Sequence, residues 1–394
     1  MITVTIMATR TPDIVIFGAG IAGLWTFHRL KKRGYDALLF EKEAIGCGQT
    51  LASQGIIHSG LKFAIAGKVS TLARSISAMP EIWRSALKGE GEVDLATARK
   101  AADSQLLLVP GGLIGNLSKI VAKKTLGKNV REINARDWPE PITQSGFKGS
   151  VIFMDELVLD IPSVLCALAE PYRNAIRKIR ADISADPMAF LESQNIRAKK
   201  IIFTGAASNL PIAIDHNHDR GLEVQHRPLL MGMLKPAPFP LFAHLVGTSE
   251  KPVATITTHK ARDGALIWYL GGGVAERAKN APVQDVMTAA KKAFASYLPD
   301  LDLSAVRWSA LPIDRVEGKS RTESWMPDTP TLHKTENCLY AWPTKLTFAP
   351  MLSDMILNEL DKEKITPSKT VTDWSFLPPV SYGQTPWDSA QWTD

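Results

Sequence analysis

A stretch near the start of the chain, DIVIFGAGIAGLWTFHRLKKRGYDALLFEKE, constrains the fold most strongly. Residues 14–17 form a continuous apolar run, as expected for a parallel strand that is buried on both faces. Gly18, Gly20 and Gly23 follow at GxGxxG spacing, and apolar residues then recur at helical intervals before a second apolar run ends at Glu41. The pattern predicts a strand, a glycine turn, a helix and a second strand.

Each part of this unit has a chemical use. Gly18 permits a tight turn, Gly20 lets the backbone approach a pyrophosphate, and Gly23 lets the helix pack closely. The helix N-terminus presents free N–H groups to an anion. Glu41 ends the second strand, where a carboxylate accepts hydrogen bonds from a ribose diol and repels a 2′-phosphate. A glycine turn alone is weak evidence. Here the strand, the glycine spacing, the helix and the acidic residue at position 41 agree, and together they predict a dinucleotide site.

Charge and cysteine content narrow the class of protein. The 46 basic and 40 acidic residues give a net charge of +6 without a basic run, which argues against a nucleic-acid partner and favours small anions. Cys47, Cys166 and Cys338 form no CxxC pair, which argues against a disulfide framework or a zinc site and favours a reducing compartment. His216 and His218 lack a third ligand at a recognised spacing, so we predict a solvated loop and no metal site.

Membrane insertion is not expected. No run reaches the roughly 18 to 20 apolar residues that a spanning helix needs, and the start of the chain lacks a signal-peptide pattern. We therefore expect a cytoplasmic protein with no membrane span, and leave peripheral association open.

The segment KEAIGCGQTLASQGIIHSGLKFAIAG follows Glu41 without clear periodicity. A simple NAD-binding unit would continue with another strand and helix, and long irregular loops inside compact domains tend to be functional. FGAGIAGLW, LLFEKE and GCGQTLASQGIIHSGLKF resemble the amino-terminal signature of the D-amino-acid oxidase superfamily of FAD enzymes. Its relatives include glycine and sarcosine oxidases, L-2-hydroxyglutarate dehydrogenase and glycerol-3-phosphate dehydrogenase. The resemblance implies that Ser53, Gly55 and His58 lie near the flavin.

His58 is the first catalytic candidate. The resemblance implies that it contacts flavin or substrate as a hydrogen-bonding or proton-handling group. The alternative is a loop histidine whose ring is satisfied by the backbone.

A second glycine turn completes the predicted cofactor site. Residues 201–203 form a buried strand before TGAAS, which resembles the late turn that closes the family's FAD site; the alternative is an ordinary strand and turn. The cofactor-binding residues predicted from both turns, the loop and the C-terminal segment are Gly18, Gly20, Ile21, Ala22, Gly23, Glu41, Lys42, Thr50, Ser53, Gly55, Ile56, Gly205, Lys345, Leu346 and Thr347.

The C-terminal third resembles the family again. WSALPIDRVEGKSRTESWMPDTPTLH resembles a stretch in which an arginine precedes a turn, so Arg321 is the first candidate to clamp a substrate carboxylate and Arg315 the second. Each has the alternative of being a surface arginine. Lys62 aligns with a basic residue of the glycerol-phosphate branch. Monomeric sarcosine oxidase and its kin carry a flavin-linked cysteine here, but VEGKSRTESW has none, so we expect non-covalent FAD.

Lys345 is the remaining catalytic candidate. PTKLTFAP stands where many relatives have a GHG loop, and the resemblance then places Lys345 where a cation stabilises the anionic reduced flavin, assisted by a helix dipole. The alternative is an exposed lysine at a helix start.

The predicted fold is α/β, with a Rossmann-like FAD-binding domain interleaved with an α+β substrate domain on a mixed, largely antiparallel sheet. The second domain is expected to contain the hairpin PVATITTHKARDGALIWYLGGG, with His259 either facing substrate or bonded within the sheet, and the helix VQDVMTAAKKAFASYLPDL. The aromatic tail is either a docking segment or packed on its own domain. The predicted boundaries are 12–80, 145–220 and 325–365 for the FAD domain, 81–144 and 221–324 for the substrate domain, and 366–394 for the tail.

These features predict an FAD-dependent oxidoreductase. It would transfer hydride from a C–N or C–O carbon of a small anionic substrate, an amino acid or amine that carries a carboxylate, to flavin N5. Oxygen or another acceptor would reoxidise the flavin. The alternatives are a hydroxy-acid dehydrogenase that reduces a quinone or carrier, and a non-catalytic FAD-binding partner subunit.

Overall fold

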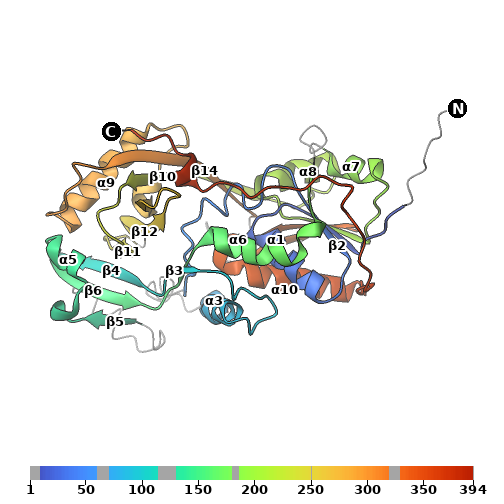
Figure 1. The fold of residues 1–394 in the computed structure, drawn as a ribbon, viewed down its shortest axis with the longest axis horizontal. Helices are drawn as coiled ribbons and strands as arrows, with labels where there is room; N and C mark the ends of the chain where they lie inside the picture. The colour runs from blue at the N-terminus through green and yellow to red at the C-terminus, as the bar shows by residue number, and fades with distance from the viewer. Residues whose placement is uncertain are drawn as a thin grey trace.

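The structure, a computed structural model, describes residues 9–59, 71–113, 130–179, 186–249, 251–318 and 329–393. These residues form an elongated molecule with two halves, each built on its own large sheet (Figure 1). The mixed α/β architecture with two interleaved parts confirms the predicted fold class.

The first sheet has six strands in the order β15-β16-β9-β1-β2-β8. All neighbours pair in parallel except β15, which runs antiparallel to β16. The continuous apolar runs of the sequence become its buried central strands, as expected for a sheet covered on both faces. Its strands are β1 (Ile14–Phe17), β2 (Ala37–Glu41), β8 (Ile176–Lys178), β9 (Lys200–Phe203), β15 (Thr331–Lys334) and β16 (Cys338–Trp342).

Helix α1 (Ile21–Lys32) follows the glycine turn and is buried along most of its length. It packs beside α10 (Ala349–Lys362) and α6 (Ile161–Ala169), as Figure 1 shows. A helix enclosed on all sides needs apolar residues all round, which explains why α1 reads IAGLWTF with little amphipathic contrast. The other helices of this half are α3 (Thr71–Leu87), α7 (Pro187–Ser193) and α8 (Asn209–Asp215).

The second sheet has eight strands in the order β14-β10-β13-β12-β11-β4-β6-β5. All neighbours are antiparallel except β11 and β4. The predicted hairpin is confirmed as β12 and β13, and the predicted helix as α9 (Val283–Tyr297). The strands are β4 (Gln105–Pro110), β5 (Val130–Ile133), β6 (Gly149–Met154), β10 (Val224–Lys235), β11 (Ala243–Leu245), β12 (Ala254–Lys260), β13 (Leu266–Gly271) and β14 (Arg307–Gly318).

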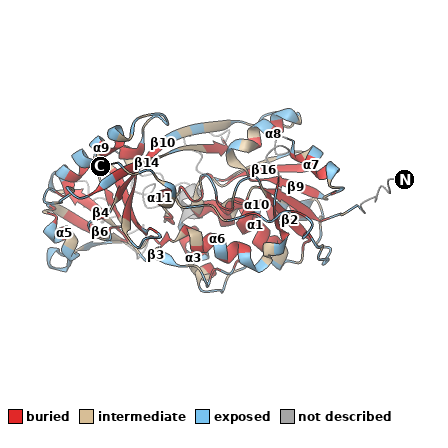
Figure 2. Ribbon diagram, turned by 45° about the horizontal axis from the view of Figure 1, so that its top comes forward, coloured by how far each residue is buried: buried red, intermediate tan, exposed pale blue. Residues whose placement is uncertain are grey.

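The chain crosses between the halves several times. Strand β6 follows the predicted return to the FAD domain at residue 145, yet it pairs with β4 and β5 in the eight-stranded sheet. The chain then enters β7 (Val158–Leu159), which pairs with β3 (Lys100–Ala102), before α6 begins. Figure 2 shows buried strands at the centre of both halves and exposed residues on the outer helices. Because β6 belongs to the second sheet and α6 packs against α1 in the first half, the turn after β6 lies where the two halves meet.

The C-terminal tail packs on its own chain across both halves. Tyr382 forms a bridge with Ile45 of the first half, and Thr393 forms one with Trp308 of the second. The ring of Trp387 stacks on that of His259, with the centroids 4.3 Å apart. The described part of the tail is therefore held by intramolecular contacts, but it packs on both halves and not on a single domain, as the second predicted alternative had it. No helix within the described ranges is long and apolar enough to cross a membrane.

Candidate active site

A cavity of about 760 Å³ lies where the two sheets meet, a size typical of sites for small molecules and cofactors. Every predicted cofactor-binding residue except Gly23 lines it, and so do His58 and Arg315. Arg321 and Lys62 lie outside the residues that the structure describes. His259 is elsewhere: it is buried within the second sheet, where its Nε2 lies 3.0 Å from Thr257 Oγ1.

The glycine turn forms one end of the cavity. Gly18 has φ +107°, and a Cβ there would lie 2.9 Å from the carbonyl carbon of Thr204. A Cβ on Gly23 would lie 1.9 Å from Gly18 O, so Gly23 serves the close packing of helix and turn and does not line the cavity. Gly20, Ile21 and Ala22 bring the N-terminus of α1 to the cavity wall, where first-turn N–H groups have no intrahelical partner.

Two threonines tie this turn to neighbouring segments. Thr50, from the long loop, accepts a hydrogen bond from Ile21 N at 3.0 Å. Thr204 Oγ1 donates to Gly18 O at 2.9 Å, and Gly205 N donates to Asn209 Oδ1 at 2.8 Å. The second predicted glycine turn therefore packs directly against the first.

Glu41 lies at the end of β2 beside the glycine turn. Its Oε2 accepts from Ala19 N at 2.8 Å and its Oε1 from Glu43 N at 2.9 Å. Burial raises the pKa of this carboxyl, against the opposing effect of these backbone hydrogen bonds. A carboxylate has about four acceptor sites, so capacity remains for ligand hydroxyl groups. The neighbouring Lys42 donates to Ser208 Oγ at 3.3 Å.

The long loop passes through the centre of the cavity lining. Gly55 has φ +75°, and a Cβ there would lie 2.3 Å from Leu159 O, so only glycine fits. Ser53 Oγ is buried and has no hydrogen-bond partner among the residues described. Ile56 adds an apolar wall. Ser53 itself lines the cavity, and buried hydroxyl groups usually have a hydrogen-bond partner.

The PTKLTFAP segment forms another wall. Thr344 adopts φ +60°, and Lys345, Leu346 and Thr347 line the cavity before α10 begins. The ammonium group of half-buried Lys345 lies 5.7 Å from the centre of the Phe348 ring. Thr347 Oγ1 accepts from His58 N at 3.1 Å, which joins this segment to the long loop.

His58 lies beside a buried carboxylate that sequence reasoning missed. The ring atom Nδ1 is 3.3 Å from Oε2 of Glu156, whose side chain is 3% exposed. Glu156 stands in the turn between β6 and β7, far from His58 in sequence, and no spacing rule connects the two residues. The ring contact to a carboxylate differs from the predicted alternative of a histidine satisfied by the backbone.

Arg315 lies in the roof of the cavity. The lining residues beside it on β10 and β14 include the apolar Leu229, Met231 and Ile313 and the acidic Asp314. Its guanidinium donates to Thr344 O at 2.9 Å and to the buried carboxylate of Glu317. Burial is the main cause that lowers the pKa of Arg315.

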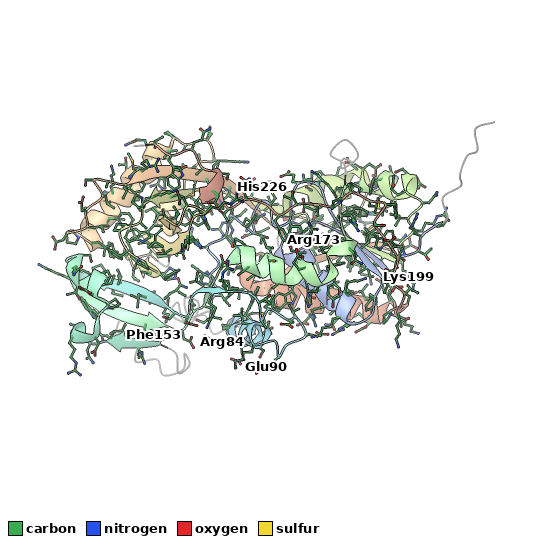
Figure 3. All side chains as sticks on the ribbon, viewed as in Figure 1. Arg84, Glu90, Phe153, Arg173, Lys199 and His226 are labelled. Atoms are coloured by element: carbon green, nitrogen blue, oxygen red, sulfur yellow. The ribbon has the colours of Figure 1, made fainter. Side chains whose placement is uncertain are left out.

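A second guanidinium shares the same carboxylate. Arg227 Nη1 lies 3.8 Å from Glu317 Oε2, and Gln225 donates to that oxygen at 3.0 Å. The adjacent Asp314 pairs with His226, labelled in Figure 3, at 2.7 Å. Two guanidinium groups therefore share the single carboxylate of Glu317.

Comparisons with known proteins agree with this geometry. The family described as FAD dependent oxidoreductase matches residues 13–321. A protein of Pseudomonas aeruginosa named "Probable FAD-dependent oxidoreductase" is 36% identical over 367 residues, which cover 91% of this chain and 93% of that protein. The chain belongs to the FAD-dependent oxidoreductase family.

Solved structures show the same fold for this FAD-dependent oxidoreductase. The crystal structure of the Pseudomonas aeruginosa FAD-dependent oxidoreductase has a TM-score of 0.80 and 29% identity, covering 97% of this chain and 99% of that one. Glycine oxidase from Geobacillus kaustophilus has a TM-score of 0.61 at 13% identity, covering 92% and 100%. L-α-glycerophosphate oxidase from Mycoplasma pneumoniae, with FAD bound, has a TM-score of 0.62 at 14% identity, covering 89% and 95%. The last two similarities concern the fold alone.

The cavity of this FAD-dependent oxidoreductase fits its cofactor. The glycine turn and the N-terminus of α1 suit a pyrophosphate, because no side chain at Gly18 or Gly20 blocks the backbone. Glu41 retains acceptor capacity for ribose hydroxyls, and Ser53 Oγ is a buried polar atom that lacks a described partner. We therefore assign these residues to the FAD site as a proposal.

The FAD is expected to be non-covalent. Cys47 lines the cavity, but its thiol donates to Glu43 Oε2 at 3.2 Å, and burial together with that carboxylate raises its pKa to about 11. A protonated thiol is a poor nucleophile. Acid or heat should therefore release FAD into the supernatant, measured by its absorbance after the protein is removed. Flavin that remains with the precipitated chain would contradict this.

Proposed function

We propose that this FAD-dependent oxidoreductase oxidises a small substrate in which a carboxylate adjoins the reacting C–N or C–O carbon, with amino acids as the first class and hydroxy acids as the second. The observation that carries the proposal is Arg315, an arginine that lines the cavity beside Leu229, Met231 and Ile313. A charged group beside apolar residues needs polar partners, and a substrate carboxylate would join Glu317 and the Thr344 carbonyl as a partner of this guanidinium.

The local charge balance supports an anionic substrate. Arg315 and Arg227 share the carboxylate of Glu317, while the neighbouring carboxylate of Asp314 pairs with His226. Arg315 reaches the cavity, whereas Arg227 is not among the described lining residues. A carboxylate bound by Arg315 would give this guanidinium an anionic partner that it does not share with Arg227, and the planar guanidinium suits such charge-assisted hydrogen bonds geometrically.

The remaining lining residues position such a substrate. Bound FAD supplies the oxidant, which accepts a hydride from the substrate carbon. The Arg315 side chain donates to the Thr344 carbonyl, and the backbone N–H of His58 donates to Thr347, so both residues are joined to the same short segment. A substrate bound between them would be oriented at two points.

Anaerobic mixing of the holoenzyme with amino acids and hydroxy acids tests the proposal. Bleaching of the flavin by a carboxylate-bearing compound is the expected result, and the class that bleaches it identifies the C–N or C–O bond. Oxygen uptake then separates an oxidase from a dehydrogenase. If no acid in either class reduces the flavin, the result would contradict the proposed function and favour the alternative of a non-catalytic FAD-binding subunit.

Lys345 provides a separate prediction about the cofactor. A cation near the flavin stabilises its reduced, more negative state, so Lys345→Met should lower the midpoint potential. A loss of about 1.4 kcal/mol corresponds to about 30 mV for a two-electron couple. Sulfite should also bind more weakly, while FAD content stays unchanged.

Lys279→Met is the matched control, because Lys279 also lines the cavity but is exposed. Solvent screening should keep its effect on the potential small. Equal potentials for Lys345→Met and the parent protein would show that Lys345 does not act on the flavin.

A further inference from the structure

The Glu156 carboxylate, which lies beside His58, accepts hydrogen bonds from several donors. Glu156 Oε1 accepts from Ser59 N and from Ser59 Oγ, each at 2.8 Å. Oε2 accepts from Gln105 Nε2 at 3.3 Å and lies 3.3 Å from His58 Nδ1. Burial alone raises the pKa of Glu156, but the hydrogen bond and charge of His58, with His244 and Ser59, lower it to about 2. Both oxygens of Glu156 accept hydrogen bonds from N–H or O–H donors, which is the arrangement of an ionised carboxylate that only accepts.

The surrounding elements hold this carboxylate in place. The turn that carries it is pinned by Arg84 of α3, labelled in Figure 3, which pairs with the Asp155 carboxylate and donates to Asp155 O at 3.2 Å. Gln105 is fully buried at the start of β4, where it pairs with Met154 of β6. Helix α3, strand β4 and the long loop that carries Ser59 thus fix Glu156 relative to the His58 ring.

We propose that Glu156 is a positioning residue that keeps a proton on Nδ1 of His58 and so makes Nε2 the acceptor nitrogen of a residue that lines the cavity. Because Oε2 has no proton to give, the contact at 3.3 Å requires Nδ1 to donate. In a neutral imidazole the other nitrogen is then the acceptor. The part of this inference that concerns substrate rests on the function proposed above.

The inference narrows the substrate class. An acceptor at His58 would bind a hydroxyl or amino N–H, while Arg315 would bind the carboxylate. Both residues line one cavity, and the backbone of His58 and the side chain of Arg315 are hydrogen-bonded to the segment from Thr344 to Thr347. The site should therefore favour acids with a hydrogen-bond donor on the reacting carbon over acids in which that donor is blocked by a methyl group.

Glu156→Gln should exchange the donor and acceptor nitrogens of the His58 ring. A glutamine keeps one acceptor oxygen, which the two Ser59 donors would hold, so its NH₂ group would face His58 and Gln105. Gln105 Oε1 is buried without a hydrogen-bond partner in the described parts of the chain, so this amide can turn to accept. Nδ1 of His58 would then accept as well, and the proton would move to Nε2.

Nitrogen NMR of histidine-labelled holoenzyme, recorded where the ring is neutral, measures which nitrogen carries the proton. A His58→Asn sample assigns the signal. We expect Nδ1–H in the parent protein and in Glu156→Asp, and Nε2–H in Glu156→Gln. Glu317→Gln alters another buried carboxylate beside the cavity and should leave the tautomer unchanged. A parent signal showing Nε2–H, or the same tautomer in the parent and Glu156→Gln, would overturn the proposal.

Ligand preference gives a second readout. Glycolate and methoxyacetate carry the same carboxylate but differ in the O–H donor, and anaerobic flavin spectra report their binding. The parent should prefer glycolate by about tenfold, the ratio that about 1.4 kcal/mol of hydrogen bonding produces. Glu156→Gln should lose this preference, and Glu317→Gln should weaken both acids alike.

The two proposals fail in different ways. If neither acid binds the parent, the proposed function fails, while the NMR result still decides the role of Glu156. If both acids bind equally to the parent, or Glu156→Gln keeps the preference for glycolate, the role of Glu156 fails while the carboxylate site stands. Should Glu156→Gln lose FAD, the tautomer of the parent and of Glu156→Asp remains decisive.

Discussion

Gly23→Ala should yield protein that no longer retains FAD. The added Cβ would lie 1.9 Å from Gly18 O and 2.7 Å from Thr204 Oγ1, so the backbone of the glycine turn has to move. That displacement separates α1 from the turn that it presents to the cofactor. The closest contact of the added Cβ is a backbone oxygen, so no side-chain rotation can relieve the clash. We therefore expect the free energy of unfolding to fall by at least about 3 kcal/mol. Flavin absorbance per chain and thermal unfolding measure both effects.

Gly112→Ala is the matched control for this substitution. A Cβ at Gly112 meets no atom of the described residues within 4 Å. Its effect on stability should stay within about 0.5 kcal/mol, and the protein should remain yellow. A Gly23→Ala protein that is yellow and as stable as the Gly112→Ala control would contradict the packing of α1 against the glycine turn.

Arg315→Lys should weaken substrate binding about thirtyfold or more, which corresponds to about 2 kcal/mol. Lysine keeps the charge but lacks the planar fork that contacts Glu317, the Thr344 carbonyl and a carboxylate together. FAD content should be unchanged, because the cofactor residues lie on other segments. Titration of flavin reduction with the best substrate measures the change.

Arg227→Lys is the control, since Arg227 pairs with the same Glu317 and is not among the described lining residues. It should affect binding much less than Arg315→Lys. An unchanged titration for Arg315→Lys would exclude Arg315 as the carboxylate ligand and return Arg321 as the first candidate.

The local parts of the site were predictable from sequence. The glycine turn, the helix that follows and Glu41 occupy consecutive positions, so spacing alone indicates their geometry. The structure adds why Gly55 is glycine, because it approaches a backbone carbonyl of a distant segment, Leu159 O, and it shows that Gly23 packs against Gly18 O within the glycine turn. Whether these residues bind FAD stays a proposal until the cofactor is observed in place.

The long-range parts were not predictable. Glu156 meets His58 because β6 leaves the second sheet at the junction of the two halves, and a single sequence contains no signal for that pairing. The sharing of Glu317 by Arg227 and Arg315 depends on the register of β10 and β14. The path of the tail across both halves depends on side-chain packing, such as the stack of Trp387 on His259. The domain boundaries stay predictions.

Anaerobic reduction of the bound flavin by matched pairs of an acid and its primary amide tests the central claim most directly. The two members of a pair share the reacting carbon and differ in the charge that Arg315 would bind. We predict that the acid reduces the flavin at concentrations at least about thirtyfold lower than the amide, a difference of about 2 kcal/mol. Equal reduction by the amide would show that no carboxylate is recognised, and would contradict the assignment of Arg315 and of an anionic substrate.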